Sequence, residues 1–203
     1  MEIIEEIIQR EWDFFQHVQH IDGRASCQDD FETFEKQRTA QFLVYTPELL
    51  QSYLNDLKTY LEIGRNPIME KYAYMMQSSD PEYYKTIEND LPSIDEFQKQ
   101  IIDTICNIQV SMRESFNQQY PVLASLSRVT HKEEDEKEDT SFETYLRGEL
   151  MTYSPTSLYL YGQMIINMAN HHENMTVEIM KNTVKAYGYK DLDDAEEKMH
   201  QQI

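Results

Sequence analysis

Glycine and proline are scarce in this sequence, whose 203 residues include 5 Gly and 6 Pro. At average usage, a chain of this length would carry roughly 24 of the two together. Collagen-like repeats, flexible linkers and turn-rich all-β architectures all need more of both residues. Their scarcity therefore leaves a mostly helical fold as the expectation.

Cysteines and long hydrophobic runs are also scarce. The two cysteines, Cys27 and Cys106, lie far apart and form no Cys-x-x-Cys pair, which indicates free thiols in a reducing compartment. No stretch approaches the ~20 apolar residues that span a bilayer, and the acidic N-terminal segment lacks the basic start of a signal peptide. We therefore expect a cytoplasmic protein that does not contact a membrane.

Positive charge is the third shortage, since 18 Lys+Arg stand against 37 Asp+Glu and give a net charge of −19. A protein that neutralises nucleic-acid phosphates needs a basic surface, so we expect no nucleic-acid partner. The 40% of hydrophobic residues are enough to fill a core, which excludes disorder of the whole chain. We predict one domain over residues 1–203, with the acidic stretch 131–139 as a solvated loop or linker.

Helical periodicity predicts an all-α fold of eight or nine packed helices with no sheet. Apolar residues recur at helical spacing over residues 3–19. Three later helices each begin with a polar cap followed by proline, whose missing N–H and fixed φ suit the first helical position: Thr46-Pro47, Asn66-Pro67 and Asp80-Pro81. A capping box of Ser93 with Glu96 predicts the longest helix, over about residues 94–118.

Residues 23–30 form the segment richest in functional groups. Cys27 lies just before the expected start of a helix at Asp29 or Asp30, and Arg24 is three residues away. Both features lower the pKa of a thiol, so Cys27 is a candidate nucleophile, with Gln28 and Asp29 as candidate ligand contacts. The structural alternative is a turn with an aspartate cap in which Cys27 is simply packed.

Arginines are few, and most of the candidates lie in polar segments that could line one pocket. Arg24, Arg65 and Arg147 occupy three such segments, and Arg38 lies one helix away from the first. Guanidinium groups suit carboxylate and phosphate ligands, so convergence of these four would create an anion site. Neighbouring polar residues complete the set: Lys71 and Tyr72 as further ligand contacts, and Glu70 and Glu149 as candidate acid/base groups. The alternative is that the arginines pair internally with acidic residues and hold helices together.

Metal and nucleotide sites have weaker support. Asp13, His17 and His20 share one helical face, but zinc sites draw on three or four ligands and an exposed polar face explains the pattern as well. No glycine-rich phosphate loop is present, so we expect no nucleotide cofactor. The sequence therefore predicts no metal site and no cofactor.

Several segments in one order resemble a bacterial family known as domain of unknown function 4125. The resemblance covers about residues 5–165 and rests on the following motifs: GRASCQDDFETF, Arg38-x-x-Gln41-Phe42, SYLNDL, GRNPIMEKYAYMM, Tyr120-Pro121 and SFETYLRGELMTYS. It implies a predominantly helical, cytoplasmic, stand-alone bacterial protein. It implies no activity, substrate or cofactor, and therefore no catalytic residues.

Three functional hypotheses follow from these observations. The first is a polar pocket between helices that binds, and in one version transforms, a small anionic metabolite. The second is a non-catalytic interaction or regulatory module that meets a protein partner or a second copy of the chain. The third is a metal-binding helical protein.

Overall fold

The structure, a computed structural model, describes residues 1–18, 23–137 and 139–201. Over these residues the chain forms α-helices and short 3-10 helices without a strand, so the expected all-α class is confirmed. The α-helices are α1 (Glu2–Gln16), α2 (Phe31–Phe42), α3 (Pro47–Glu62), α4 (Pro67–Ser79), α5 (Pro81–Ile87), α6 (Glu96–Gln119), α7 (Pro121–Ser125), α8 (Phe142–Leu150), α9 (Pro155–Asn170), α10 (Met175–Ala186) and α11 (Leu192–His200). The 3-10 helices are η1 (Ser26–Asp29), η2 (Glu88–Asp90) and η3 (Lys132–Glu134).

The predicted number of eight or nine helices is wrong, because the described residues contain eleven α-helices. Short helices account for the difference. The helix α7 has only five residues, which is little more than one turn and too short to repeat a hydrophobic period. None of the described helices is long and apolar enough to cross a bilayer.

Local capping chemistry sets most helix starts. The side chains of Thr46, Asn66 and Asp80 accept hydrogen bonds from backbone N–H groups in the first turns of α3, α4 and α5, which confirms the three proline-containing starts. The capping box of α6 begins two residues later than predicted, at Asp95 and not at Ser93. Asp95 caps this helix and accepts from the N–H of Gln98 at 2.8 Å, while the side chain of Gln98 accepts from the N–H of Asp95 at 3.2 Å.

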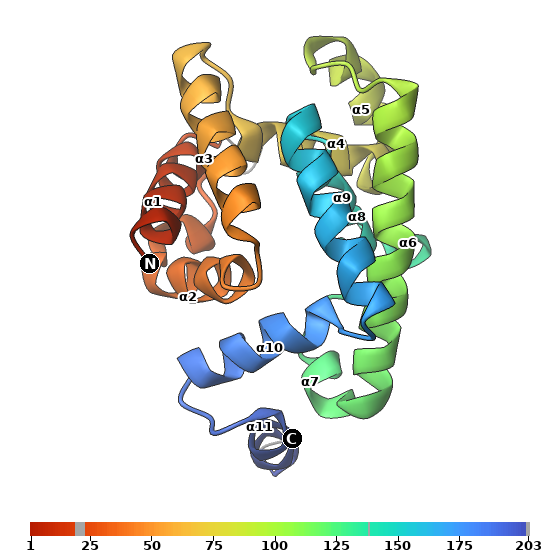
Figure 1. Cartoon of the computed structure of the whole chain (residues 1–203). Coiled ribbons are helices and arrows are strands. Elements are labelled where there is room, and N and C mark those ends of the chain that lie inside the picture. The colour runs from red at the N-terminus through yellow and green to blue at the C-terminus, as the bar shows by residue number, and fades with distance from the viewer. Residues whose placement is uncertain (19–22, 138, 202–203) are drawn as a thin grey trace.

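The helices form two groups that α10 bridges (Figure 1). In one group α1 packs against α2 and α3, and in the other the long α6 packs against α8 and α9. The helix α3 also contacts α9, while α10 contacts both α2 and α6. This arrangement gives a main core from both groups and a second, smaller core where α7 and α11 meet the end of α6.

The contact between α4 and α8 requires a glycine. An added Cβ at Gly148 would lie 2.7 Å from Cγ of Met75 and 2.9 Å from the backbone oxygen of Lys71. Real Cβ atoms do not approach neighbours so closely, so the two helices are in contact only because residue 148 has no side chain. This close approach brings Lys71 of α4 next to the residues of α8.

The acidic stretch 131–139 is mostly exposed, but it is attached to the helices beside it. The carboxylate of Asp135 accepts from the N–H of Ser141 at 2.6 Å and from the hydroxyl groups of Ser78 and Thr144, both at 2.5 Å. These bonds hold the pKa of Asp135 below its ordinary value despite the opposing effect of burial. The described part of the loop is therefore fixed to α4 and to the start of α8.

Candidate functional site

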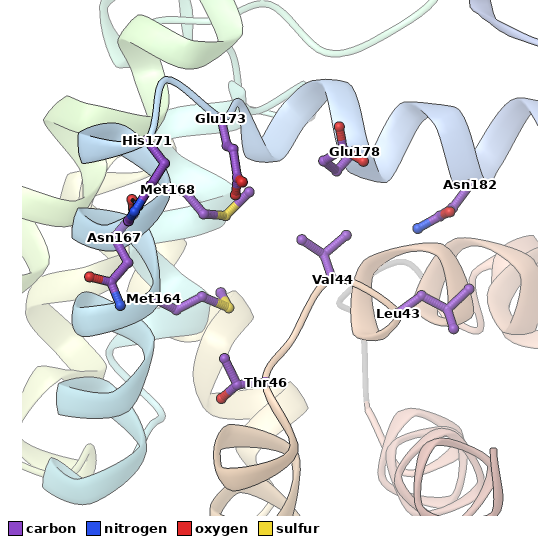
Figure 2. Close-up of a pocket in the computed structure, with 10 residues that line it drawn as sticks. All are labelled: Leu43, Val44, Thr46, Met164, Asn167, Met168, His171, Glu173, Glu178 and Asn182. Atoms are coloured by element: carbon purple, nitrogen blue, oxygen red, sulfur yellow. Dashed lines mark hydrogen bonds between the residues drawn. The ribbon is translucent and has the colours of Figure 1, made fainter.

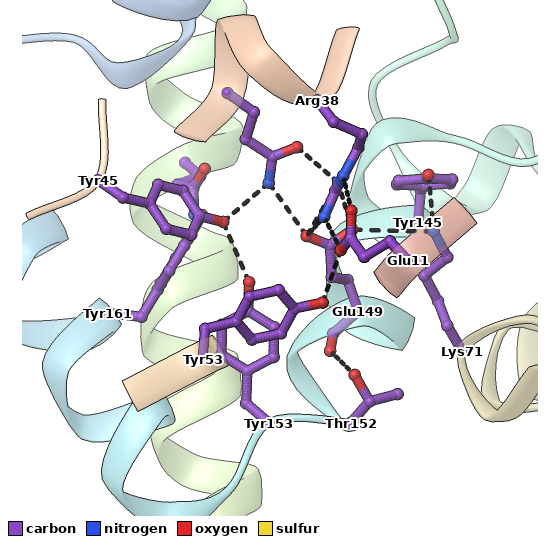
Figure 3. A network of polar contacts seen from close by, with 12 residues as sticks. Glu11, Arg38, Tyr45, Tyr53, Lys71, Tyr145, Glu149, Thr152, Tyr153 and Tyr161 are labelled. Carbon is purple, nitrogen blue, oxygen red and sulfur yellow. Dashed lines mark hydrogen bonds and ion pairs between the residues drawn. The ribbon is translucent and has the colours of Figure 1, made fainter. Parts of the chain in front are cut away.

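A buried ion-pair network lies where α1, α2 and α8 meet (Figure 3). Arg38 donates from Nε and Nη2 to the two carboxylate oxygens of Glu11, at 2.7 and 2.5 Å. Its Nη1 lies 3.3 Å from the carboxylate of Glu149. Arg38 is only 7% exposed and Glu11 is fully buried. Buried charges of this kind persist only when they are paired and hydrogen-bonded.

Neutral side chains complete the hydrogen bonding of the two carboxylates. The hydroxyl of Tyr53 donates to Glu11 at 2.7 Å. The amide of Gln41 donates to Glu149 at 3.0 Å and to the hydroxyl of Tyr45 at 2.8 Å. Burial raises the pKa of the tyrosines around the network, which keeps them protonated: Tyr45, Tyr53, Tyr153 and Tyr161.

Lys71 of α4 extends the network toward the surface. Its ammonium donates to the hydroxyl of Tyr145 at 2.7 Å and lies 3.8 Å from Glu149. Burial alone would lower the pKa of Lys71, but Tyr145, Tyr72 and Glu149 raise it above the ordinary value, so Lys71 is charged. Burial likewise acts to raise the pKa of Glu149, while Arg38 and Lys71 outweigh burial and lower it.

Arg128 adds a second cation beside the same tyrosine. Its guanidinium carbon lies 4.9 Å from the ring centre of Tyr145, and the ammonium of Lys71 lies 4.1 Å from that centre. Arg128 donates to the backbone oxygen of Thr140 at 2.8 Å and to its hydroxyl at 3.0 Å. Within the part of the chain that the structure describes, no carboxylate pairs with it.

The charges around Tyr145 are therefore unequal. The cations of the extended network are Arg38, Lys71 and Arg128. Its carboxylates are Glu11 and Glu149. The network carries one positive charge in excess, although the whole chain is strongly acidic.

The segment that carries Cys27 is closed by its own polar residues. Gln28 is 1% exposed, and its amide donates to the backbone oxygens of Phe15 and Val18 at 2.8 and 3.1 Å. Arg24 donates to Asp29 at 2.9 Å and to the backbone oxygen of Gln28 at 2.7 Å. Gln28 thus fastens the loop to α1, as does Arg24 through its bond to the side-chain oxygen of Gln16. Asp29 instead closes the loop by pairing with Arg24.

Cys27 itself is exposed in η1. It is among the groups whose charge raises the pKa of Tyr72, although burial has the largest effect on that pKa. This places Cys27 in the neighbourhood of Tyr72, whose ring centre is 5.1 Å from the ammonium of Lys71. Its predicted reactivity stays a prediction.

The other predicted arginines lie in separate ion pairs. Arg65 forms two hydrogen bonds with Glu70, at 2.9 and 2.6 Å. Arg147 pairs with Asp103 at 2.5 Å and with Glu143 at 3.6 Å. Arg24, Arg65 and Arg147 therefore share no partner, which is the geometry of the internal-pairing alternative. The structure brings together Arg38, Lys71, Tyr72 and Glu149 instead.

Another cleft lies elsewhere, between the α2–α3 turn, α9 and α10 (Figure 2). Its volume is about 710 Å³. Met164 and Met168 give it apolar surface, and Glu173 and Glu178 line the α10 side. Its lining includes no Lys or Arg and none of the residues predicted from the sequence, so its charge does not suit an anion.

Possible metal ligands are engaged in other contacts. Asp13 accepts from Gln9 through its side chain, and its backbone oxygen lies 2.7 Å from Nδ1 of His17; His20 lies outside the described residues. His131, Glu133 and Glu143 also gather within 4.8 Å. Glu143, however, lies 3.8 Å from Lys132 and 3.6 Å from Arg147, so cations already occupy the surroundings of its carboxylate.

Sequence reasoning missed Glu11, Tyr53, Tyr145 and Arg128. Glu11 had a readable signal, because it occupies the apolar stripe of α1 that includes Ile4, Ile7 and Phe15. A lone acidic residue on a buried helical face requires a partner. Arg128 had no such signal, because it lies in an irregular connection after α7.

Comparisons with known proteins identify only a family. The model of a family described as a protein of unknown function (DUF4125) matches residues 1–197. No curated protein and no solved structure matches the chain.

Proposed function

This chain belongs to the DUF4125 family, and from that premise we propose that it binds a small anionic metabolite beside Tyr145. The observation that carries the proposal is the excess positive charge of the network, where Lys71 and Arg128 face one tyrosine ring and Arg128 lacks a described carboxylate partner. An anion at this place would make the network neutral. Electrostatic attraction is strong there because Lys71 is shielded from water.

Donors for such an anion are available at the site. The hydroxyl of Tyr145 accepts from Lys71 and keeps its own hydrogen for donation. Arg128 is exposed and uses one nitrogen, Nη1, in its bonds to Thr140. Its remaining N–H groups can form the forked pair of hydrogen bonds that carboxylates and phosphates accept.

Binding fits the network better than acid/base catalysis by the predicted residues. Both oxygens of Glu149 lie against Arg38, and its pKa is lowered, whereas a general acid or base at neutral pH needs a pKa near 7. Glu70 is bonded to Arg65 through both oxygens. The role proposed for Glu149 is to hold Arg38 and Lys71 in place. We also propose a bacterial, cytoplasmic setting, which the two free cysteines and the earlier resemblance support.

A thermal-shift screen tests the proposal, with inorganic phosphate, sulfate and a series of mono-, di- and tricarboxylates as probes. A ligand at a hundred times its dissociation constant should stabilise the native state by about 2.7 kcal/mol. The variant Arg128→Gln should abolish this shift while the protein stays folded, because residue 128 is exposed.

The matched control is Lys132→Gln, which removes an exposed cation from the same connection but lies beside Glu143. It should retain the shift. If no anion stabilises the wild-type protein, or if both variants lose the shift equally, the proposal fails. In the first case, self-association measured by analytical ultracentrifugation would favour the interaction-module alternative.

A further inference from the structure

A second site, apart from Tyr145 and its proposed anion, lies along the C-terminal half of α6. A groove of about 530 Å³ runs there between α6, α7 and the connection to η3. It contains side chains of both charge signs, including Glu114, Arg128 and Glu134. Two buried polar atoms beside it have no partner among the described residues, and both belong to α6.

The first of these atoms is Nε of Arg113. Arg113 is 6% exposed, and its single hydrogen bond to the described residues is a long one, 3.4 Å from Nη2 to the backbone oxygen of Arg128, a residue that lines the groove. Burial lowers the pKa of Arg113 because no carboxylate opposes it. The rings of Phe116 and Phe142 lie 5.8 and 5.7 Å from its guanidinium carbon, near the limit of a useful cation–π contact.

The second atom is the side-chain oxygen Oδ1 of Asn117. Asn117 lines the groove, and its amide nitrogen donates to the hydroxyl of Thr130 at 2.9 Å. It follows Arg113 by four residues in the same helix, so the two side chains share one face. Beside the groove, α6 thus has a charged donor and a neutral acceptor that the described residues leave unpaired.

These two atoms require opposite properties of a ligand. Arg113 requires an anionic acceptor, whereas Oδ1 of Asn117 requires a donor. The carboxylates of Glu114 and Glu134 line the same groove and favour positive charge on the ligand. Phosphate or a dicarboxylate would pair with Arg113 but would place negative charge beside the carboxylates of Glu114 and Glu134. A simple amine would be repelled by the positive charge of Arg113.

We infer that this groove binds a small zwitterion that carries both a carboxylate and an ammonium group, as a free amino acid does. The carboxylate pairs with Arg113 of α6, beside the groove. The ammonium donates to Oδ1 of Asn117 and lies on the side of Glu114. Binding is non-covalent and restores the hydrogen bonds and the counter-charge that the two α6 side chains lack.

Isothermal titration calorimetry with the standard amino acids tests the chemistry of the ligand. Each amino acid is compared with its N-acetyl derivative and with its amide. N-acetylation removes the ammonium, and amidation removes the carboxylate. We expect one or more free amino acids to bind and both derivatives to bind about thirtyfold more weakly, which corresponds to ~2 kcal/mol. Absence of binding by every free amino acid, or equal binding of the derivatives, would overturn the inference.

Variants locate the site and separate it from a folding defect. Arg113→Met replaces an unpaired buried charge with an apolar side chain, so it should keep or raise the melting temperature while amino-acid binding is lost. Asn117→Ser should also weaken binding, whereas Gln119→Ser, an exposed change on the same helix outside the lining of the groove, should not. Retained binding in Arg113→Met would place the ligand elsewhere.

The test is independent of the anion site at Tyr145. Tyr145→Phe removes a donor of the anion site and should weaken the response to inorganic anions there, whereas Tyr145 does not line the groove, so amino-acid binding should stay intact. Loss of both responses in this one variant would mean that the groove and the Tyr145 site are the same site, contrary to the inference.

Discussion

Arg38 and Arg113 are buried to the same extent in opposite electrostatic surroundings, with exposed fractions of 7% and 6%. Arg38 has Glu11 and Glu149 beside it, and although burial opposes them, these carboxylates raise its pKa. Within the described part of the chain, Arg113 has only aromatic rings and one backbone oxygen beside it. At the scale of the single residue, the cost of burying an arginine is therefore offset by two carboxylates at position 38. At position 113, no described carboxylate offsets it.

Replacement of Arg38 by Met should be strongly destabilising. It leaves the buried carboxylates of Glu11 and Glu149 without their main partner, and removal of one member of a buried ion pair costs about 3–5 kcal/mol. Urea denaturation measures this loss. The control Lys85→Met breaks an exposed pair with Glu82 and should cost less than ~1 kcal/mol. Similar losses of unfolding free energy in both variants would show that the buried network stabilises the fold no more than an exposed ion pair does.

The lowered pKa of Glu149 predicts a loss of stability in acid. Its folded-state pKa lies below the ordinary value of 4.5 because Arg38 and Lys71 outweigh burial. A group of this kind stabilises the fold fully above its unfolded pKa, and this contribution disappears as pH falls through the folded pKa. Below pH 4.5, the free energy of unfolding of Glu149→Gln should therefore depend less steeply on pH than that of the wild type. The exposed variant Glu2→Gln should follow the wild-type slope, and parallel curves for all three proteins would contradict the assignment.

At the scale of the helix, glycine has opposite roles in α8 and α9. An added methyl at Gly148 meets atoms of α4 at 2.7 and 2.9 Å, whereas one at Gly162 meets Ile105 no closer than 3.5 Å. Gly148→Ala should therefore cost about 1–3 kcal/mol through overpacking. Gly162→Ala should be neutral or should stabilise by up to about 1 kcal/mol, because alanine favours a helix. Thermal unfolding of the two variants compares them directly, and equal effects would mean that α4 and α8 are not in close contact.

Helix starts were predictable where their cause is local. Thr46, Asn66 and Asp80 cap helices with a side chain and a proline that stand next to each other in the sequence. The start of α6 was predicted at the wrong pair because Ser93 with Glu96 and Asp95 with Gln98 offer the same capping pattern. Local chemistry alone does not choose between two overlapping boxes.

At the scale of the whole molecule, the hydrophobic residues separate into two cores of unequal size. The smaller core consists of Phe116, Leu123, Val184, Leu192 and Ala195. It joins α7 and α11 to the ends of α6 and α10, with help from Glu196, whose carboxylate accepts from the N–H groups of Val122 and Leu123 at 2.7 and 2.9 Å. Few buried side chains hold α11 in place, so we expect this part to open more easily than the main core.

Native-state hydrogen exchange should show this difference. We expect amides of α11 to exchange with a smaller opening free energy than amides of α9, which contributes Leu158, Tyr161 and Ile165 to the main core. Leu192→Ala should accelerate exchange in α11 and α7 and leave α9 unchanged, because Leu192 belongs to the smaller core. Equal protection of α9 and α11 in the wild type would mean that the two cores unfold as one.

The candidate site was much less predictable than the fold. Arg38 and Glu149 were both candidates in the sequence, but their pairing joins α2 with α8 and depends on how whole helices pack. Arg147 was a candidate on the same local grounds, but it pairs with Asp103 of α6 instead. Sequence spacing identifies residues on one face of one helix, whereas this network takes one or two residues from each of several helices.

The pairing of Arg38 with Glu149 also has a consequence for the order of events during synthesis. The two residues are 111 positions apart, and at a synthesis rate of about 5–20 residues per second the second appears roughly 6–22 s after the first. Glu11, Arg38 and Tyr53 are all synthesised early. Arg38 therefore lacks its second carboxylate, Glu149, until α8 has been synthesised. The packing of α8 against the N-terminal helices is therefore a late step, and it shields the ion pair of Glu11 and Arg38 from water.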